Sequence, residues 1–241
     1  MKMIEEEFDG DHWAWKALED FVAFKDIYEY VTNQAAMDTH KDSVSYFAIR
    51  SQLHHPNSNS DLRNRAETSL KNSLNHFAAQ TLVSLCTTYE VALKQFFKSL
   101  FIKHPNYMHD YVGSKDGRGT IHLKDLVDSG DYLSFISSLA ETASSVASRG
   151  KYTESLKRAA SLCKYEQSEV IFDGIEEIQT IRNRIVHEKY LPKLGIGDLQ
   201  SSHSAVSSVI ESLCHMGIKK KLPGRYTYVK PETIIVMVEE N

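Results

Sequence analysis

Cysteine is scarce in this chain. Only Cys86, Cys163 and Cys214 occur in 241 residues, and each stands inside an apolar segment. An odd number of widely spaced thiols argues against a disulfide framework, and none of the three has the close partner that a zinc knuckle needs. We expect buried thiols in a protein of the reducing cytoplasm.

Long hydrophobic runs are also missing. No stretch reaches the roughly 18 uninterrupted apolar residues of a membrane-spanning helix. The most apolar segment, Thr81 to Ile102, is broken by Glu90, Lys94 and Lys98. The opening residues, MKMIEEEFDGD, are acidic where a secretory signal would be basic and then apolar. We therefore expect no membrane association.

An excess of positive charge is absent, since the formal net charge is -4. Any attraction for nucleic acid must then come from a local patch. The densest basic cluster, KKKLPGRYTYVK from Lys219 to Lys230, interleaves cations with Tyr226 and Tyr228. It is either a surface for phosphates and stacked bases or a solvated turn that leads into a strand.

Several common catalytic and cofactor motifs are lacking. The chain has no Gly-x-Ser-x-Gly and no HExxH, and its paired histidines (His54 with His55, His104 with His109) lack a zinc ligand set. The glycine-rich loop GSKDGRGT lacks the Lys-Ser/Thr ending of a P-loop. We expect neither a metal nor a cofactor.

What the sequence does have is helical periodicity. Apolar residues recur at three and four steps from Asp61 to about Lys103, which predicts one amphipathic helix of roughly 60 Å that either bends or projects beyond the body. A second helix is predicted from His12 to about Ala36, and the connector DSVSYFAIRSQL is either extended or helical. Further helices are expected at Ile121 to Val127, Tyr132 to Ala147, Thr153 to Cys163, Ser168 to about Lys189 and Asp198 to His215, with a hairpin of Arg225 to Val229 and Thr233 to Val238.

These patterns predict an all-α fold, a helical bundle with long antiparallel helices and a short C-terminal β-rich appendage. We divide one globular unit into an N-terminal helical extension (1–60), the bundle (61–216) and the basic, β-rich appendage (217–241).

The segment TIRNRIVHEKY, Thr180 to Tyr190, is the strongest functional candidate. Its Arg182 is followed at the fifth position by His187, but the same spacing joins Arg50 to His55 in a polar loop, so spacing alone is uninformative. Context distinguishes the first pair. Ile171, Ile175, Ile178 and Ile185 form one apolar stripe on the predicted helix, and Arg182 falls inside it.

A guanidinium on an apolar stripe needs a carboxylate, a phosphate or an open cavity. Asn183 and His187 share the opposite face with Glu176 and Thr180. Arg182 and His187 point about 140° apart on a straight helix. They converge on one substrate only if the helix ends or bends near Ile185, if the arginine wraps around, or if a second subunit supplies one group.

The segment resembles the HEPN family, helical domains of prokaryotic defence and toxin-antitoxin systems. That family carries an arginine, a polar residue and then a histidine, matched here by Arg182, Asn183 and His187. The motif helix is followed by a loop and one further helix, as in the family, and LVSLCTTYEVALKQFFKSLF resembles its long first helix. The segment from Pro105 to Gly150 is longer than in the smallest members.

The resemblance implies a metal-independent endoribonuclease that works as a homodimer in antiphage defence or as a toxin. A nucleotidyltransferase-type antitoxin or another regulator is then an expected partner. Arg182, Asn183 and His187 would be catalytic, and Arg184 and Lys189 would bind the RNA backbone. A histidine suits the proton transfers and an arginine suits the phosphate.

Two other interpretations stay open. A HEPN-like module without activity would bind nucleic acid or a protein partner through the same surface, and a helical scaffold would have no nucleic-acid role. In the first, the motif persists as an interface. In a purely structural interpretation, His187 caps a helix end or is a satisfied surface residue, and Arg182 pairs with a buried carboxylate.

Overall fold

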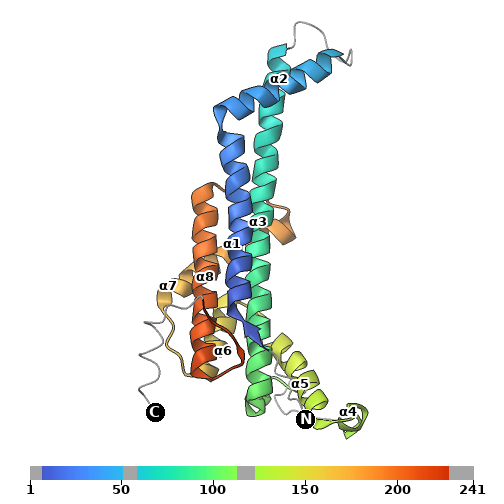
Figure 1. The fold of residues 1–241 in the computed structure, drawn as a ribbon, viewed down its shortest axis with the longest axis vertical. Helices are drawn as coiled ribbons and strands as arrows, with labels where there is room; N and C mark the ends of the chain where they lie inside the picture. Colours follow the sequence, from blue (N-terminus) through green and yellow to red (C-terminus); the bar gives the residue numbers. More distant parts are fainter. Residues whose placement is uncertain (1–6, 51–58, 113–122, 228–241) are drawn as a thin grey trace.

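The computed structural model describes residues 7–50, 59–112 and 123–227 (Figure 1). This part of the chain is a bundle of α-helices, which confirms the predicted fold class. The helices are α1 (Gly10–Thr32), α2 (Gln34–Arg50), α3 (Asn59–Lys103), α4 (Leu123–Asp128), α5 (Tyr132–Ala147), α6 (Tyr152–Cys163), α7 (Glu169–Glu188) and α8 (Ile196–Lys219), with a 3-10 helix η2 (Pro105–Met108).

The long helix α3 is the centre of the bundle. Its 45 residues correspond to about 67 Å, and it packs against α1, α2, α5, α7 and α8. The C-terminal half of α3 is buried, with Leu82, Leu93 and Phe96 fully inaccessible. Its N-terminal half extends with α2 and the end of α1 beyond the other helices (Figure 1). Of the two predicted possibilities, a bent helix or one that projects beyond the body, the structure shows the second.

Ion pairs join α2 to α3 in this projecting arm. Lys41 of α2 pairs with Glu67 of α3, and Asp42 of α2 pairs with Arg63 of α3. Lys71 also pairs with Glu67, within α3. The two lysines, Lys41 first, lower the pKa of Glu67 to about 2. These charged pairs join α2 to α3 in addition to buried apolar side chains of the arm such as Met37 and Ala66.

The first helix ends earlier than predicted. Asn33 is extended (ψ 122°), so α1 stops at Thr32 and not near Ala36. The Asn33 side chain accepts a hydrogen bond of 3.1 Å from the Ala36 amide and so begins α2. Asparagine competes with helical hydrogen bonding through its own side chain. The segment DSVSYFAIRSQL, for which the sequence left an extended or a helical connector open, is helical as far as Arg50.

A short parallel pairing joins the two ends of the described chain. Strand β1 (Phe8–Asp9) pairs with β2 (Gly224–Arg225), with Phe8 opposite Gly224. A Cβ at Gly224 would lie 2.1 Å from the Phe8 carbonyl oxygen, so the approach requires glycine. The sequence predicted a strand at Arg225 but not its partner. Tyr226 and Thr227, which were predicted to continue this strand, are not part of it. The remainder of the predicted hairpin (from residue 228 on), the GSKDGRGT loop and His55 lie outside the described residues.

Two further expectations concern the cysteine thiols and membrane-spanning helices. Cys86, Cys163 and Cys214 are all buried free thiols, as predicted. Burial raises the pKa of each thiol to about 12. No helix in the described ranges is long and apolar enough to cross a membrane.

Candidate functional site

Helix α7 carries the motif residues on two faces. Phe172, Ile175 and Ile178 are buried against the bundle, whereas Glu176, Thr180, Asn183 and His187 are exposed. The helical periodicity of the sequence predicted this separation of α7 into a buried apolar face and an exposed polar face. Arg182 lies at the boundary, with 24% of its side chain exposed.

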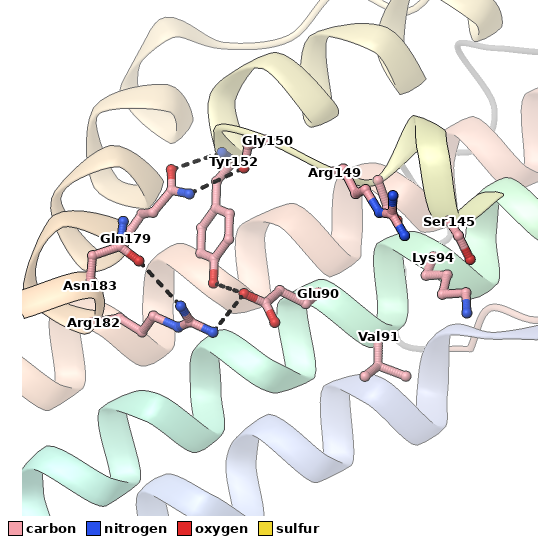
Figure 2. Close-up of a pocket in the computed structure, with 11 residues that line it drawn as sticks. Glu90, Val91, Lys94, Ser145, Arg149, Gly150, Tyr152, Gln179, Arg182 and Asn183 are labelled. Carbon is pink, nitrogen blue, oxygen red and sulfur yellow. Dashed lines mark hydrogen bonds and ion pairs between the residues drawn. The ribbon is translucent and has the colours of Figure 1, made fainter. Parts of the chain in front are cut away.

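The Arg182 guanidinium is held by two neighbours (Figure 2). Its Nη2 lies 3.5 Å from Oε1 of Glu90 on α3, and its Nη1 donates a hydrogen bond of 3.2 Å to Oδ1 of Asn183. Its Nε is buried and has no hydrogen-bond partner among the described residues. One donor of the guanidinium is therefore unsatisfied, which is costly for a buried polar atom.

Tyr152 completes the cluster from the start of α6. Its hydroxyl donates a hydrogen bond of 2.5 Å to the same Oε1 of Glu90. Burial, and then the neighbouring Cys86 and Glu90, raise the pKa of Tyr152. The phenol therefore stays protonated and remains a donor, so Glu90 receives a hydrogen bond from Tyr152 and a charge contact from Arg182.

Arg182 and Asn183 line an open pocket of about 560 Å³. The pocket lies between α7, the end of α5 and the start of α6, over α3 (Figure 2). Its lining is mostly polar and comprises Glu90, Val91, Lys94, Ser145, Ser148, Arg149, Gly150, Tyr152, Gln179, Arg182 and Asn183. Three cations and one carboxylate give it a positive balance.

Gln179 fixes α7 to the α5–α6 loop beside the pocket. Its Oε1 accepts a hydrogen bond of 2.9 Å from the Tyr152 amide, and its Nε2 donates one of 3.3 Å to the Gly150 carbonyl. Gly150 has φ +104°, a conformation that L side chains rarely adopt. A glycine here lets the chain turn from α5 into α6 next to the site.

The other predicted site residues lie outside this pocket. His187 is exposed in the last turn of α7 and is not part of the lining. Arg184 stacks over the Tyr190 ring at 3.8 Å and lies 3.7 Å from Glu188. Lys189 ends the helix in the left-handed conformation with φ 54°. Arg182 and Asn183 are thus brought together, and His187, Arg184 and Lys189 form a separate exposed end.

Sequence reasoning did not identify the residues that surround Arg182. Glu90 and Lys94 appeared only as charges that interrupt an apolar run, and Arg149, Tyr152 and Gln179 were not singled out. The only available signal was that Glu90 and Lys94 are charged residues within the core helix, four apart and so on one face.

The basic cluster after α8 has structural partners. Lys219 Nζ donates to the Lys164 carbonyl at 2.7 Å, and Lys220 Nζ donates to the Tyr107 hydroxyl at 2.9 Å. The Tyr226 hydroxyl donates to the Leu222 carbonyl at 3.2 Å. These contacts favour the interpretation of the cluster as a turn. The described ranges also hold no group of three His, Cys, Asp or Glu side chains placed to bind a metal ion.

Comparisons with known proteins add no assignment to this geometry. No protein-family model matches the chain, and no curated protein and no solved structure matches it significantly.

Proposed function

We propose that this protein is a HEPN-type endoribonuclease that cleaves RNA at a site shared between two copies of the chain. The observation that carries the proposal is the placement of Arg182. Its guanidinium contacts Asn183, borders an open polar pocket and keeps one buried N–H donor without a partner. An arginine so placed suits a phosphate oxygen, because the guanidinium offers a fork of donors.

A second copy supplies what one chain lacks. Helix α7 continues past Ile185 to Glu188, so it does not end where convergence would need it to end. The Arg182 side chain is held toward Glu90 on α3, while His187 points about 140° away around the helix. Two α7 helices packed across a two-fold axis would bring the His187 of one copy to the Arg182 of the other.

Exposed apolar side chains at this end of α7 support such packing. Val186 is 46% exposed and Tyr190 and Leu191 are each 38% exposed. On the helical wheel Val186 lies between Arg182 and His187, about 40° from the first and 100° from the second. An apolar residue between two polar site residues is what a dimer interface through this face requires.

The proposed reaction needs only groups that the two chains hold. One His187 takes the proton from the ribose 2′-hydroxyl, whose oxygen attacks the phosphorus. The bond from phosphorus to the 5′-oxygen breaks, and the other His187 gives a proton to that oxygen, leaving a 2′,3′-cyclic phosphate and a 5′-hydroxyl. Arg182 stabilises the charge on the phosphorane, and Asn183 orients the guanidinium. Arg184 and Lys189 contact the backbone nearby.

This chemistry uses neither a metal nor a cofactor. The proposed setting is the cytoplasm, in antiphage defence or a toxin-antitoxin pair. A nuclease of this kind needs restraint, and we propose a nucleotidyltransferase-type antitoxin or another regulator as the partner that provides it.

Incubation of the purified protein with total RNA in EDTA tests the proposal. Wild type is expected to cleave RNA and to leave cyclic phosphate ends, and His187→Ala is expected to lose at least a hundredfold in rate. His109→Ala is the matched control, since His109 is also exposed, lies outside the Arg182 pocket and pairs with its neighbour Asp110 at 3.1 Å. RNA left intact by wild type would refute the ribonuclease, and RNA cut equally by both variants would refute the catalytic role of His187.

A second function is favoured by the contact between Glu90 and Arg182. A carboxylate 3.5 Å from Nη2 already neutralises part of the arginine charge, as expected for a HEPN-like module that binds nucleic acid or a protein without cleaving it. RNA binding that depends on Arg182, with no cleavage under any condition, distinguishes this module from the nuclease.

A further inference from the structure

Arg149 stands at the end of the pocket away from Arg182 (Figure 2). It follows Ser148, the residue that caps the end of α5, and is exposed. Its side chain makes no hydrogen bond or ion pair with the described residues, whereas its backbone is fixed. Arg158 donates hydrogen bonds to the carbonyls of Ala147, at 2.9 Å, and of Arg149. A free cation is thus carried on a rigid turn.

Lys94 lies at the same end of the pocket as Arg149 (Figure 2). Lys94 and Lys98 both pair with Glu141, at 2.6 Å and 3.0 Å. The lysines, Lys94 first, lower the pKa of Glu141, which therefore stays charged. The Lys94 ammonium group, paired with Glu141, therefore lies at the same end of the pocket as the Arg149 guanidinium.

The pocket therefore has two cationic ends. Arg182 forms one end and is partly neutralised by Glu90. Arg149 and Lys94 form the other end, where Ser145 also lies (Figure 2). A single small anion would need only one of these ends. Two cationic ends along one open groove suit a ligand with successive negative charges, as in a single-stranded polynucleotide.

We propose that Arg149, assisted by Lys94, binds the RNA backbone phosphate adjacent to the one held at Arg182. The identity of the ligand as RNA rests on the proposed function. In this arrangement Arg149 is a binding residue and not a catalytic one, since it positions the strand in the pocket while Arg182 faces the reacting phosphate.

Binding of an uncleavable RNA tests the proposal apart from catalysis. The probe is a fluorescent 2′-O-methyl hexanucleotide, whose anisotropy gives Kd over a series of salt concentrations. Arg149→Ala is expected to weaken binding about tenfold and to lower the slope of log K against log salt by about 0.7, the loss of one phosphate contact. Arg149→Lys should recover part of the affinity, because the charge returns.

Arg65→Ala is the matched control. Arg65 is an exposed arginine on the same α3 helix as Lys94, but it lies roughly 37 Å along the helix from Glu90. Equal affinity and equal salt slope for the Arg149→Ala and Arg65→Ala proteins would overturn the proposal, as would a wild type that binds no probe. Arg149-dependent binding by a protein that cleaves no RNA would uphold this inference while the ribonuclease fails.

Discussion

Nη2 of Arg182 on α7 lies 3.5 Å from Oε1 of Glu90 on α3, although 92 positions separate the two residues in the chain. This contact holds the arginine at the pocket wall, where a phosphate would compete with the carboxylate for the same guanidinium. The two proposed functions differ at this contact. Cleavage needs the Arg182 guanidinium for the reacting phosphate, whereas binding without cleavage is compatible with an arginine that Glu90 partly neutralises.

Replacing Glu90 with glutamine tests that competition. Glu90→Gln keeps an oxygen that accepts from Tyr152 but removes the charge opposite Arg182. We expect RNA to bind several-fold more tightly without slower cleavage, and stability to change by no more than about 1 kcal/mol, because the pair is partly exposed. Measurements are RNA affinity, cleavage rate and urea unfolding.

Glu188→Gln is the control for this substitution, since Glu188 is the exposed partner of Arg184 at 3.7 Å. A large loss of cleavage in Glu90→Gln with unchanged stability would contradict the expectation, since it would place Glu90 in the proton transfer itself.

Two α7 substitutions separate folding from association. Ile175 is fully buried, so Ile175→Ala should lower the free energy of unfolding by about 2–5 kcal/mol through lost burial and a cavity. Val186 is 46% exposed, so an aspartate there should leave the stability of the isolated chain almost unchanged. Chemical denaturation of both proteins checks this difference.

Val186→Asp should instead abolish self-association. The added charge would be buried where two α7 helices meet, at a high cost. Analytical ultracentrifugation should find a monomer for Val186→Asp and a dimer for wild type, with cleavage reduced in parallel. A dimer of unchanged affinity in Val186→Asp would exclude this face of α7 as the interface.

The three thiols should be inert in the folded protein. Because burial raises each pKa to about 12, almost no thiolate exists at pH 8. Titration with an aromatic disulfide should show no reaction until denaturant unfolds the chain, and then three equivalents. Rapid reaction of one thiol under native conditions would show that its helix opens locally.

The lowered pKa of Glu67 predicts that the stability of the projecting arm depends on pH. The folded pKa of Glu67, about 2, is below the usual 4.5, owing first to Lys41 and then to Lys71. The contribution of the pair to stability is therefore complete above about pH 4.5 and is lost as the pH falls toward 2. Carboxyl NMR titration of Glu67 measures this, and Lys41→Gln should raise the pKa. An unchanged value in that variant would mean that Lys41 does not hold the carboxylate.

The helical spans could be predicted because each depends on local periodicity. The apolar stripe of α7 and its exposed face follow from residues three and four apart, and Arg182 stood out as the residue that broke the stripe. The expectation that it needs a carboxylate or a cavity is met by Glu90 and the pocket.

The partners of Arg182 could not be predicted, because they come from other helices. Nothing in the sequence around Glu90 or Tyr152 indicates that α3 and α6 meet α7 there. The pairing of Phe8 with Gly224 escaped prediction for the same reason, since a two-residue strand carries no periodic signal and exists only through a contact between distant segments.

Subunit mixing measures the shared site most directly. Wild type and His187→Ala are co-expressed in known ratios, purified as mixed dimers, and assayed for RNA cleavage in EDTA. If both copies of His187 serve one site, activity falls with the square of the wild-type fraction, to about a quarter in an equal mixture. A linear fall, to about half, would show that one His187 is enough for each site and would contradict a site that uses both copies of His187.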